Sequence, residues 1–140
     1  MKIKIPIRLI KLDDGYHIFI SAKINGRKAT LIIDTGASRS AFDKERIKQF
    51  VDEHKFEKHE KLASGIGTNS MKSHLAVLDS FTIGKIKEEN YLAILLDFSH
   101  VVTAYRQMGV KPIDGVLGSD ILRKYKAVID YGKKILLLSV

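Results

Sequence analysis

The sequence predicts a mainly β fold with two or three short helices. Strand-like segments recur along the whole chain, and short turn signals rich in Gly, Asn and Asp separate them. Most of these segments follow one another as hairpins, which favours a barrel-like or mixed β architecture over a doubly wound sheet. The chain has 140 residues, a length that suits one domain over residues 1–140 with its own core.

The N-terminal quarter of the chain predicts three strands. Residues 3–12 alternate between apolar and charged side chains, which is typical of a half-buried strand. Residues 16–24 predict a second strand, and Asn25-Gly26 is the strongest short hairpin signal in the chain. Residues 27–33 predict the third strand. Its last residues, Leu31-Ile32-Ile33, form a continuous apolar run that indicates burial on both faces.

Helices are expected at three places. Asp43 is expected to cap a helix over residues 43–56, because its apolar residues recur at helical spacing. Ser99 is expected to cap a second helix that ends at Gly109. A short third helix is expected to begin at Ser119 or Asp120, with Asp120 as its cap.

The remaining segments predict further hairpins. Residues 60–77 are expected to form a glycine-bearing hairpin with residues 64–70 near its tip. Other strands are expected at residues 81–83, 91–96, 126–131 and 134–140.

Composition narrows the possible classes of protein. The chain has no cysteine, which excludes disulfides and cysteine-ligated zinc. Its net charge is +8, but the lysines are scattered along the sequence, which favours a solvated basic surface, and no nucleic-acid partner is expected. Neither a signal peptide nor a membrane-spanning segment is apparent, so a cytoplasmic location is the default expectation.

The segment that carries chemistry is Leu31-Ile32-Ile33-Asp34-Thr35-Gly36-Ala37-Ser38. An acidic residue directly follows three apolar strand residues and precedes a hydroxyl, a glycine and two small residues. This pattern presents a carboxylate on a tight loop against an apolar wall, and Gly36 lets another chain or a ligand approach the backbone closely. The alternative interpretation is an ordinary turn at the end of a strand.

This segment resembles the active-site loop of the retropepsin-like aspartic peptidases. A second element that is similar to the family is Gly115-Val116-Leu117-Gly118, which precedes the expected short helix. The order of parts also matches one retropepsin-like lobe, from hairpin and catalytic loop to glycine-rich hairpin and closing hairpin. The resemblance implies a retropepsin-like acid-protease half-barrel with peptidase activity.

Aspartic peptidases use two carboxylates around one water, and this chain has one Asp-Thr-Gly. Asp114 and Asp130 lack the flanking residues of a second copy of the motif. A two-fold homodimer would supply the second acid by bringing two copies of Asp34 together. The resemblance implies the same arrangement.

The resemblance also implies the roles of individual residues. The catalytic residues would be Asp34, Thr35 and Gly36, and the expected partners are a peptide or protein substrate and a second copy of the chain. No metal or cofactor is implied. The residues that would bind substrate are Ala37, Ser64, Gly65, Ile66 and Gly67.

Three questions stay open at this level. The chain is expected to be an endopeptidase, but a retropepsin-like dimer that binds peptides with little cleavage has the same motifs. A basic nucleic-acid-binding module is a third hypothesis, which predicts a salt-sensitive affinity for DNA or RNA. The terminal run over residues 135–138 fits either a buried core strand or, by resemblance, a dimer contact.

Overall fold

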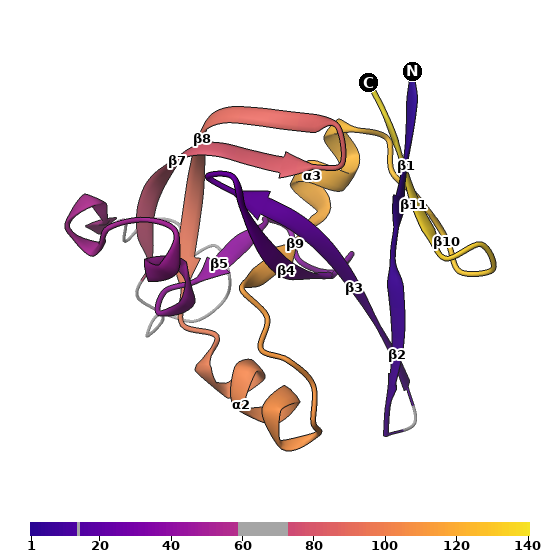
Figure 1. Cartoon of the computed structure of the whole chain (residues 1–140), viewed down its shortest axis with the longest axis horizontal. Coiled ribbons are helices and arrows are strands. Elements are labelled where there is room, and N and C mark those ends of the chain that lie inside the picture. Colours follow the sequence, from indigo (N-terminus) through magenta and orange to yellow (C-terminus); the bar gives the residue numbers. More distant parts are fainter. Residues whose placement is uncertain (14, 59–72) are drawn as a thin grey trace.

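The computed structural model of the chain is mainly β, as predicted (Figure 1). It describes residues 1–13, 15–58 and 73–140. Within these residues the strands form a sheet of three and a sheet of eight, and two α-helices and two 3-10 helices connect strands.

The eight-stranded sheet has the order β2-β3-β4-β9-β5-β8-β7-β6. Because β3 also pairs with β7, the strands from β3 to β7 close into a barrel. The closing contact pairs Lys23 with Thr82 and Ile24 with Phe81, which joins the two ends of this series of strands. The strands in sheet order are β2 (Arg8–Leu12), β3 (Gly15–Ile24), β4 (Arg27–Ile33), β9 (Gly115–Leu117), β5 (Ala41–Asp43), β8 (Ile86–Leu96), β7 (His74–Ile83) and β6 (Glu57–Lys58).

The β3–β4 hairpin forms where the sequence predicts it. Asn25 and Gly26 have φ angles of 50° and 79°, the left-handed values that a two-residue hairpin turn requires. The antiparallel register runs from Ile24 opposite Arg27 to Phe19 opposite Ile32. This hairpin places β4 between β3 and β9, within the sheet and not at its edge.

The three-stranded sheet has the order β1-β11-β10, with β1 at Lys2–Pro6, β10 at Val128–Asp130 and β11 at Ile135–Ser139. The single strand predicted over residues 3–12 is therefore wrong in extent, because the chain changes partner at Ile7. Before Ile7 it pairs with β11 and after it with β3, while the Ile7 backbone N–H donates to Lys134 O at 3.1 Å. The two chain ends lie side by side (Figure 1).

The terminal strand β11 alternates in burial although its sequence does not alternate. Leu136 and Leu138 are fully buried in the core, whereas Ile135 and Leu137 remain half-buried. Its central place between β1 and β10 explains the pattern, because alternate side chains of a strand point to opposite faces. The core role is thus confirmed for two of its leucines, and a dimer contact through the other face stays a prediction.

The second predicted helix is present as α2 (Ser99–Gln107). Phe98 occupies its N-cap position, and the Ser99 backbone N–H donates to Asp97 Oδ1 at 2.8 Å, so Ser99 itself is not the cap. The helix ends before Gly109, whose φ of 78° suits glycine, as predicted. No helix in the described part of the chain is long and apolar enough to cross a membrane.

The helix predicted over residues 43–56 is wrong. Two 3-10 helices, η1 (Arg46–Gln49) and η2 (Glu53–Lys55), occupy this segment, and Asp43 lies in strand β5. The backbone N–H groups of Asp43 and Lys44 donate to Asp114 O and Leu96 O, each at 2.8 Å. Sheet pairing therefore takes the residues that would have formed the first helical turn, and a helix loses much of its stability when shortened.

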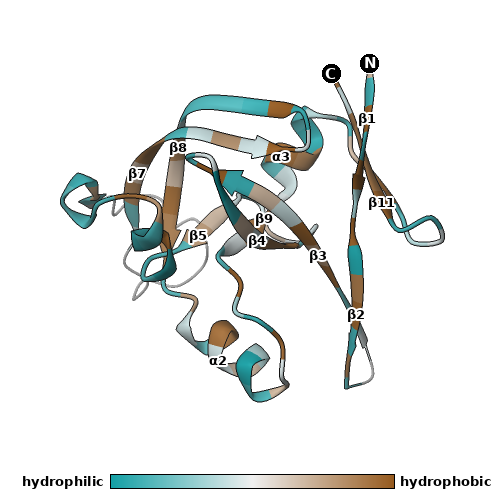
Figure 2. Ribbon diagram, in the orientation of Figure 1, coloured by the Kyte–Doolittle hydropathy of each residue, from teal (hydrophilic) through white to brown (hydrophobic). Residues whose placement is uncertain are grey.

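The main hydrophobic core fills the barrel, and a smaller cluster lies under α2. Figure 2 shows hydrophobic residues along the barrel strands, while the 3-10 helices outside the barrel are largely hydrophilic. Fully burying a large aliphatic or aromatic side chain contributes about 1.5–3 kcal/mol. The cluster under α2 consists of Leu12, Phe19, Val102, Tyr105 and Ile113.

Glu88 on β8 attaches the other α-helix, α3 (Ser119–Lys124), to the barrel. Its Oε1 accepts hydrogen bonds from Lys124 Nζ at 2.6 Å and from the Tyr125 hydroxyl. The bond from Lys124, and then the bond from Tyr125, lowers the pKa of the Glu88 carboxyl below its ordinary value. Because the pKa is lowered in the folded state, the stabilisation is present above the ordinary glutamate pKa of about 4.3. It is lost as the pH falls through the lowered pKa.

We expect Glu88→Gln to lower the free energy of unfolding at neutral pH by about 0.5–1 kcal/mol, a value that allows for solvent screening of this half-exposed cluster. The difference from wild type should disappear in strong acid, where Glu88 is protonated in both states. Thermal unfolding followed by circular dichroism between neutral and acid pH measures it. Glu89→Gln is the matched control, because Glu89 Oε1 lies 3.8 Å from Lys87 Nζ on an exposed surface. An equal effect of both substitutions would contradict the assignment.

Candidate active site

Asp34 emerges where β4 ends, at the point where the sequence predicts a carboxylate on a loop. Its backbone N–H donates to Leu117 O at 3.0 Å, which extends the parallel pairing of β4 with β9 by one residue. The Gly36 N–H donates to Asp34 Oδ1 at 2.9 Å, and the Ala37 N–H donates to Asp34 O at 3.1 Å. The loop therefore turns tightly around an exposed carboxylate and fixes its orientation.

The second predicted element, around Gly118, packs directly behind this loop. The Ser119 N–H donates to Ala37 O at 2.8 Å, and the Gly118 N–H donates to Ser40 Oγ at 2.9 Å. A Cβ on Gly118 would lie 2.6 Å from the carbonyl carbon of Arg39, closer than real Cβ atoms come to other heavy atoms. Glycine is thus required by the close approach of two backbones.

Asp120 ties the start of α3 to the same loop. Its Oδ1 accepts hydrogen bonds from the Ser40 N–H at 2.9 Å and from the Ser40 hydroxyl at 2.8 Å. The same oxygen accepts from the Ile121 N–H at 2.8 Å, although Gly118 holds the N-cap position of α3. The expectation that Asp120 is the helix cap is corrected: its carboxylate holds the residue that follows the Asp34 loop.

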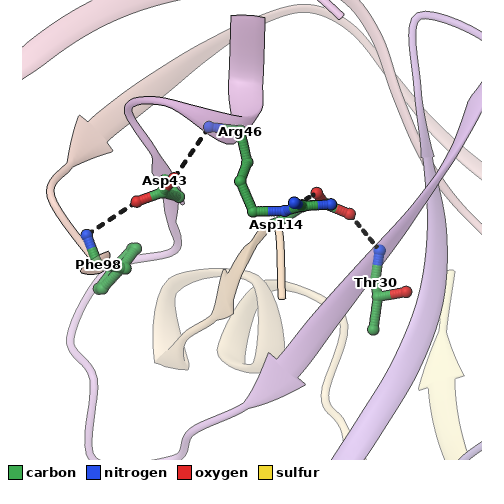
Figure 3. Close-up of polar contacts among 5 residues, drawn as sticks. All are labelled: Thr30, Asp43, Arg46, Phe98 and Asp114. Carbon is green, nitrogen blue, oxygen red and sulfur yellow. Dashed lines mark hydrogen bonds and ion pairs between the residues drawn. The ribbon is translucent and has the colours of Figure 1, made fainter. Parts of the chain in front are cut away.

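A buried pair of carboxylates braces the strands beneath the loop (Figure 3). Asp114 Oδ2 accepts from the Thr30 N–H at 2.8 Å, and its Oδ1 accepts from Arg46 Nε at 2.8 Å. Asp43 accepts from the backbone N–H groups of Arg46 and Phe98, each at 2.9 Å. Both aspartates are at most 5% exposed, so these charge-assisted bonds replace the water they lose.

This network connects β4, β5, the start of β9 and the segment before α2. Sequence reasoning missed it, because Asp114 lies 84 residues from Thr30 and its local sequence shows only that it lacks the flanking residues of the Asp-Thr-Gly motif. The signal available was an aspartate directly before the Gly-Val-Leu-Gly element. Its effect is to hold the strands that carry Asp34 in fixed relative positions.

Two hollows meet at Asp34. The smaller one, of about 370 Å³, is lined by residues of the Asp34 loop and by apolar residues of neighbouring segments. The loop residues are Asp34, Gly36, Ala37, Ser38 and Arg39. The larger one, of about 700 Å³, is lined by Asp34 and Thr35 and by a mostly apolar and aromatic wall. Among the described residues that line them, Asp34 is the only carboxylate. A mostly apolar groove with a few polar groups and one central acid can hold peptide side chains on both sides of a reacting bond.

His17 and Tyr105 place polar groups in the wall of the larger hollow. His17 Nδ1 and the Tyr105 hydroxyl lie 2.8 Å apart. Burial, and then the negative charge of Asp34, raises the pKa of the Tyr105 hydroxyl above its ordinary value. Tyr105 is therefore a neutral phenol within the electric field of Asp34.

Asp34, Thr35, Gly36 and Ala37 thus lie together on one loop, as predicted from sequence. The sequence predicts that Ser64, Gly65, Ile66 and Gly67 bind substrate from the tip of a hairpin. These residues lie outside the described residues. Within residues 1–13, 15–58 and 73–140, no group of three or more potential His, Cys, Asp or Glu ligands is placed to hold a metal ion.

The sequence matches the family model described as aspartyl protease over residues 20–121. Among solved structures, the fold is similar to a retropepsin-like aspartic protease from Rickettsia conorii, with 26% identity and a TM-score of 0.58. That match covers 99% of this chain and 88% of the other. A retroviral protease-like domain of Ddi1 from Leishmania major has 14% identity and a TM-score of 0.57, with 86% of each chain covered.

No curated protein matches the sequence. The structural matches confirm the retropepsin-like fold expected from the sequence. The family match spans the barrel strands, the Asp34 loop and the Gly118 element behind it. The chain belongs to the aspartyl protease family.

Proposed function

We propose that this chain is one subunit of a homodimeric aspartic endopeptidase with Asp34 as its catalytic carboxylate. The observation that carries the proposal is a single, oriented carboxylate at the junction of two apolar hollows. The water molecule that attacks the peptide bond must lie between two acidic groups. The described residues that line the hollows provide no second one. A two-fold axis beside Thr35 supplies that acid as the partner's Asp34.

The mechanism is general acid–base hydrolysis. Two carboxylates so close together cannot both ionise, so one is charged while the other keeps a proton. The charged group takes a proton from the water as it attacks the peptide carbonyl, and the shared proton passes to the departing nitrogen. The two protonation steps belong to the pair and not to either Asp34 alone.

Neighbouring residues serve the pair in distinct ways. The Gly36 N–H orients the Asp34 carboxylate, and the lack of a side chain at Gly36 leaves room for substrate backbone. Thr35 joins the two loops across the axis, and Ala37 lines the smaller hollow where substrate side chains bind. Ser64, Gly65, Ile66 and Gly67 also bind substrate in this proposal, the role that the sequence predicts for them.

The proposal predicts that activity depends on protein concentration. As subunits associate, the rate of peptide hydrolysis per subunit should rise with concentration and reach a plateau, because the isolated subunit has only half of the dyad. Cleavage of a peptide library, measured across a dilution series together with mass by light scattering, tests this. A constant rate per subunit from a molecule that stays monomeric would refute the dimer. A dimer that cleaves no peptide would indicate a binding role instead.

A further inference from the structure

His17 on β3 and Asp34 at the end of β4 line the same hollow. Strands β3 and β4 pair antiparallel, with Ile20 opposite Leu31 and Phe19 opposite Ile32. The pairing ends there, two residues before Asp34, and both His17 and Asp34 line the larger hollow. His17 therefore faces the same hollow as the carboxylate, from a different strand.

Tyr105 holds the imidazole ring of His17. The two rings meet edge to face with centroids 5.5 Å apart, and Tyr105 packs in the same manner on Phe19 at 5.6 Å. Tyr105 is only 5% exposed, and its hydroxyl hydrogen-bonds His17 Nδ1 at 2.8 Å. Both the position and the tilt of the imidazole are therefore set by helix α2.

The direction of this hydrogen bond determines what His17 can offer to a ligand. A phenolic hydroxyl is a better hydrogen-bond donor than acceptor, and Nδ1 of His17 is the partner that the described residues provide for the Tyr105 hydroxyl. When the phenol donates to Nδ1, a neutral imidazole carries its own proton on Nε2. An imidazolium carries a proton there as well. Nε2–H is a donor in both states, and no described residue accepts from it.

The preferred ligand for such a donor is a carboxylate. The wall around His17 is mostly apolar, which strengthens a charge-assisted hydrogen bond relative to the same bond in water. The chain carries a net charge of +8, which favours acidic peptides over basic ones. Arg39 on the smaller hollow has no ion pair among the described residues and adds positive potential beside Asp34.

We propose that His17, positioned by Tyr105, is a specificity-determining residue that binds an acidic side chain of the peptide substrate close to the scissile bond. This inference rests on the proposed function and adds the class of substrate. His17 takes no part in the proton transfers at Asp34. Tyr105 acts through His17 and does not contact the substrate carboxylate.

The test compares peptides that differ only in carrying Glu or Gln at one position, scanned across both sides of the cleaved bond. At the preferred position, wild type should hydrolyse the Glu peptide with a kcat/KM about tenfold higher than that of the Gln peptide, the value expected for one charge-assisted hydrogen bond. His17→Phe should bring this ratio close to one. Tyr105→Phe keeps the packing on Phe19 and should lower the ratio part of the way. A purely structural role would reduce hydrolysis of both peptides equally and leave the ratio unchanged.

Two further variants separate His17 from general charge effects. Lys23→Gln removes one exposed positive charge outside both hollows and should leave the ratio as in wild type. Arg39→Gln tests the other source of an acidic preference. The proposal is overturned if wild type shows no preference for Glu. It is also overturned if the preference survives in His17→Phe and is lost in Arg39→Gln.

A binding measurement distinguishes this inference from the proposed function. The same peptide pairs, labelled with a fluorophore, are titrated with wild type and with His17→Phe and followed by anisotropy. If no peptide is cleaved, hydrolysis is refuted, while a Glu preference in binding that depends on His17 still supports the inference. Equal binding of Glu and Gln peptides by wild type would refute it whether or not cleavage occurs.

Discussion

Asp34→Asn should abolish peptide hydrolysis, with a loss of at least about a thousandfold in kcat, while the protein keeps its fold. An amide of the same shape can neither take the proton of the attacking water nor hold the proton that the leaving nitrogen requires. The Asn carbonyl oxygen can still accept the 2.9 Å hydrogen bond from the Gly36 N–H, so the loop should keep its conformation. Hydrolysis of a library peptide measures the loss of activity, and circular dichroism of the same sample measures whether the fold is kept.

The same variant tests whether each site takes one acid from each subunit. In a mixture with a threefold excess of Asp34→Asn subunits, random pairing leaves about a quarter of the wild-type subunits with a wild-type partner. The activity of a fixed amount of wild type should therefore fall to about a quarter of its value, provided that subunits exchange. An equal excess of an unrelated protein is the control. Undiminished activity in a mixture whose subunits have exchanged would show that one chain carries a complete site.

The sequence predicted local features whose physical causes are also local. The turn at Asn25-Gly26 needs two left-handed residues, and those two residue types accept that conformation readily. The loop at Asp34 follows from an apolar run that ends abruptly at a small, polar segment. The end of α2 near Gly109 also has a local cause, because glycine readily adopts the left-handed conformation that follows a helix. Each of these features depends on a few consecutive side chains, so one sequence is enough to predict it.

Features that depend on distant partners were not predictable in this way. The strand break at Ile7 follows from competition between β11 and β3 for the same segment, and those strands are far apart in the sequence. The apolar spacing over residues 43–56 fits a helix, but the pairing of β5 with β8 and β9 overrides it. The pair of Asp43 and Asp114 is invisible locally for the same reason. Long-range pairing decided each of these outcomes.

Gly118→Ala should cost about 3 kcal/mol in the free energy of unfolding, the upper part of the usual range for overpacking, because the new methyl group overlaps backbone rather than a movable side chain. The added Cβ would lie 2.6 Å from Arg39 C, 2.7 Å from Arg39 O and 2.9 Å from Ala37 O. Relieving these overlaps means moving β9 and the start of α3 away from the Asp34 loop. That movement would also break the 2.8 Å bond from the Ser119 N–H to Ala37 O. We expect the melting temperature to fall by about 10 °C and hydrolysis to fall further than the folded fraction does.

Gly15→Ala is the matched control, because a Cβ at Gly15 would meet no heavy atom within 4 Å and its φ is not in the left-handed region. It should change the free energy of unfolding by less than about 1 kcal/mol. Thermal unfolding and hydrolysis rates for both variants separate a specific overlap from a general effect of adding a methyl group. If Gly118→Ala were as stable and active as Gly15→Ala, the two backbones would have to lie farther apart than the fold places them. The Gly118 element would then not support the Asp34 loop closely. The reason that glycine is needed at position 118 to hold the Asp34 carboxylate in place would be wrong as well.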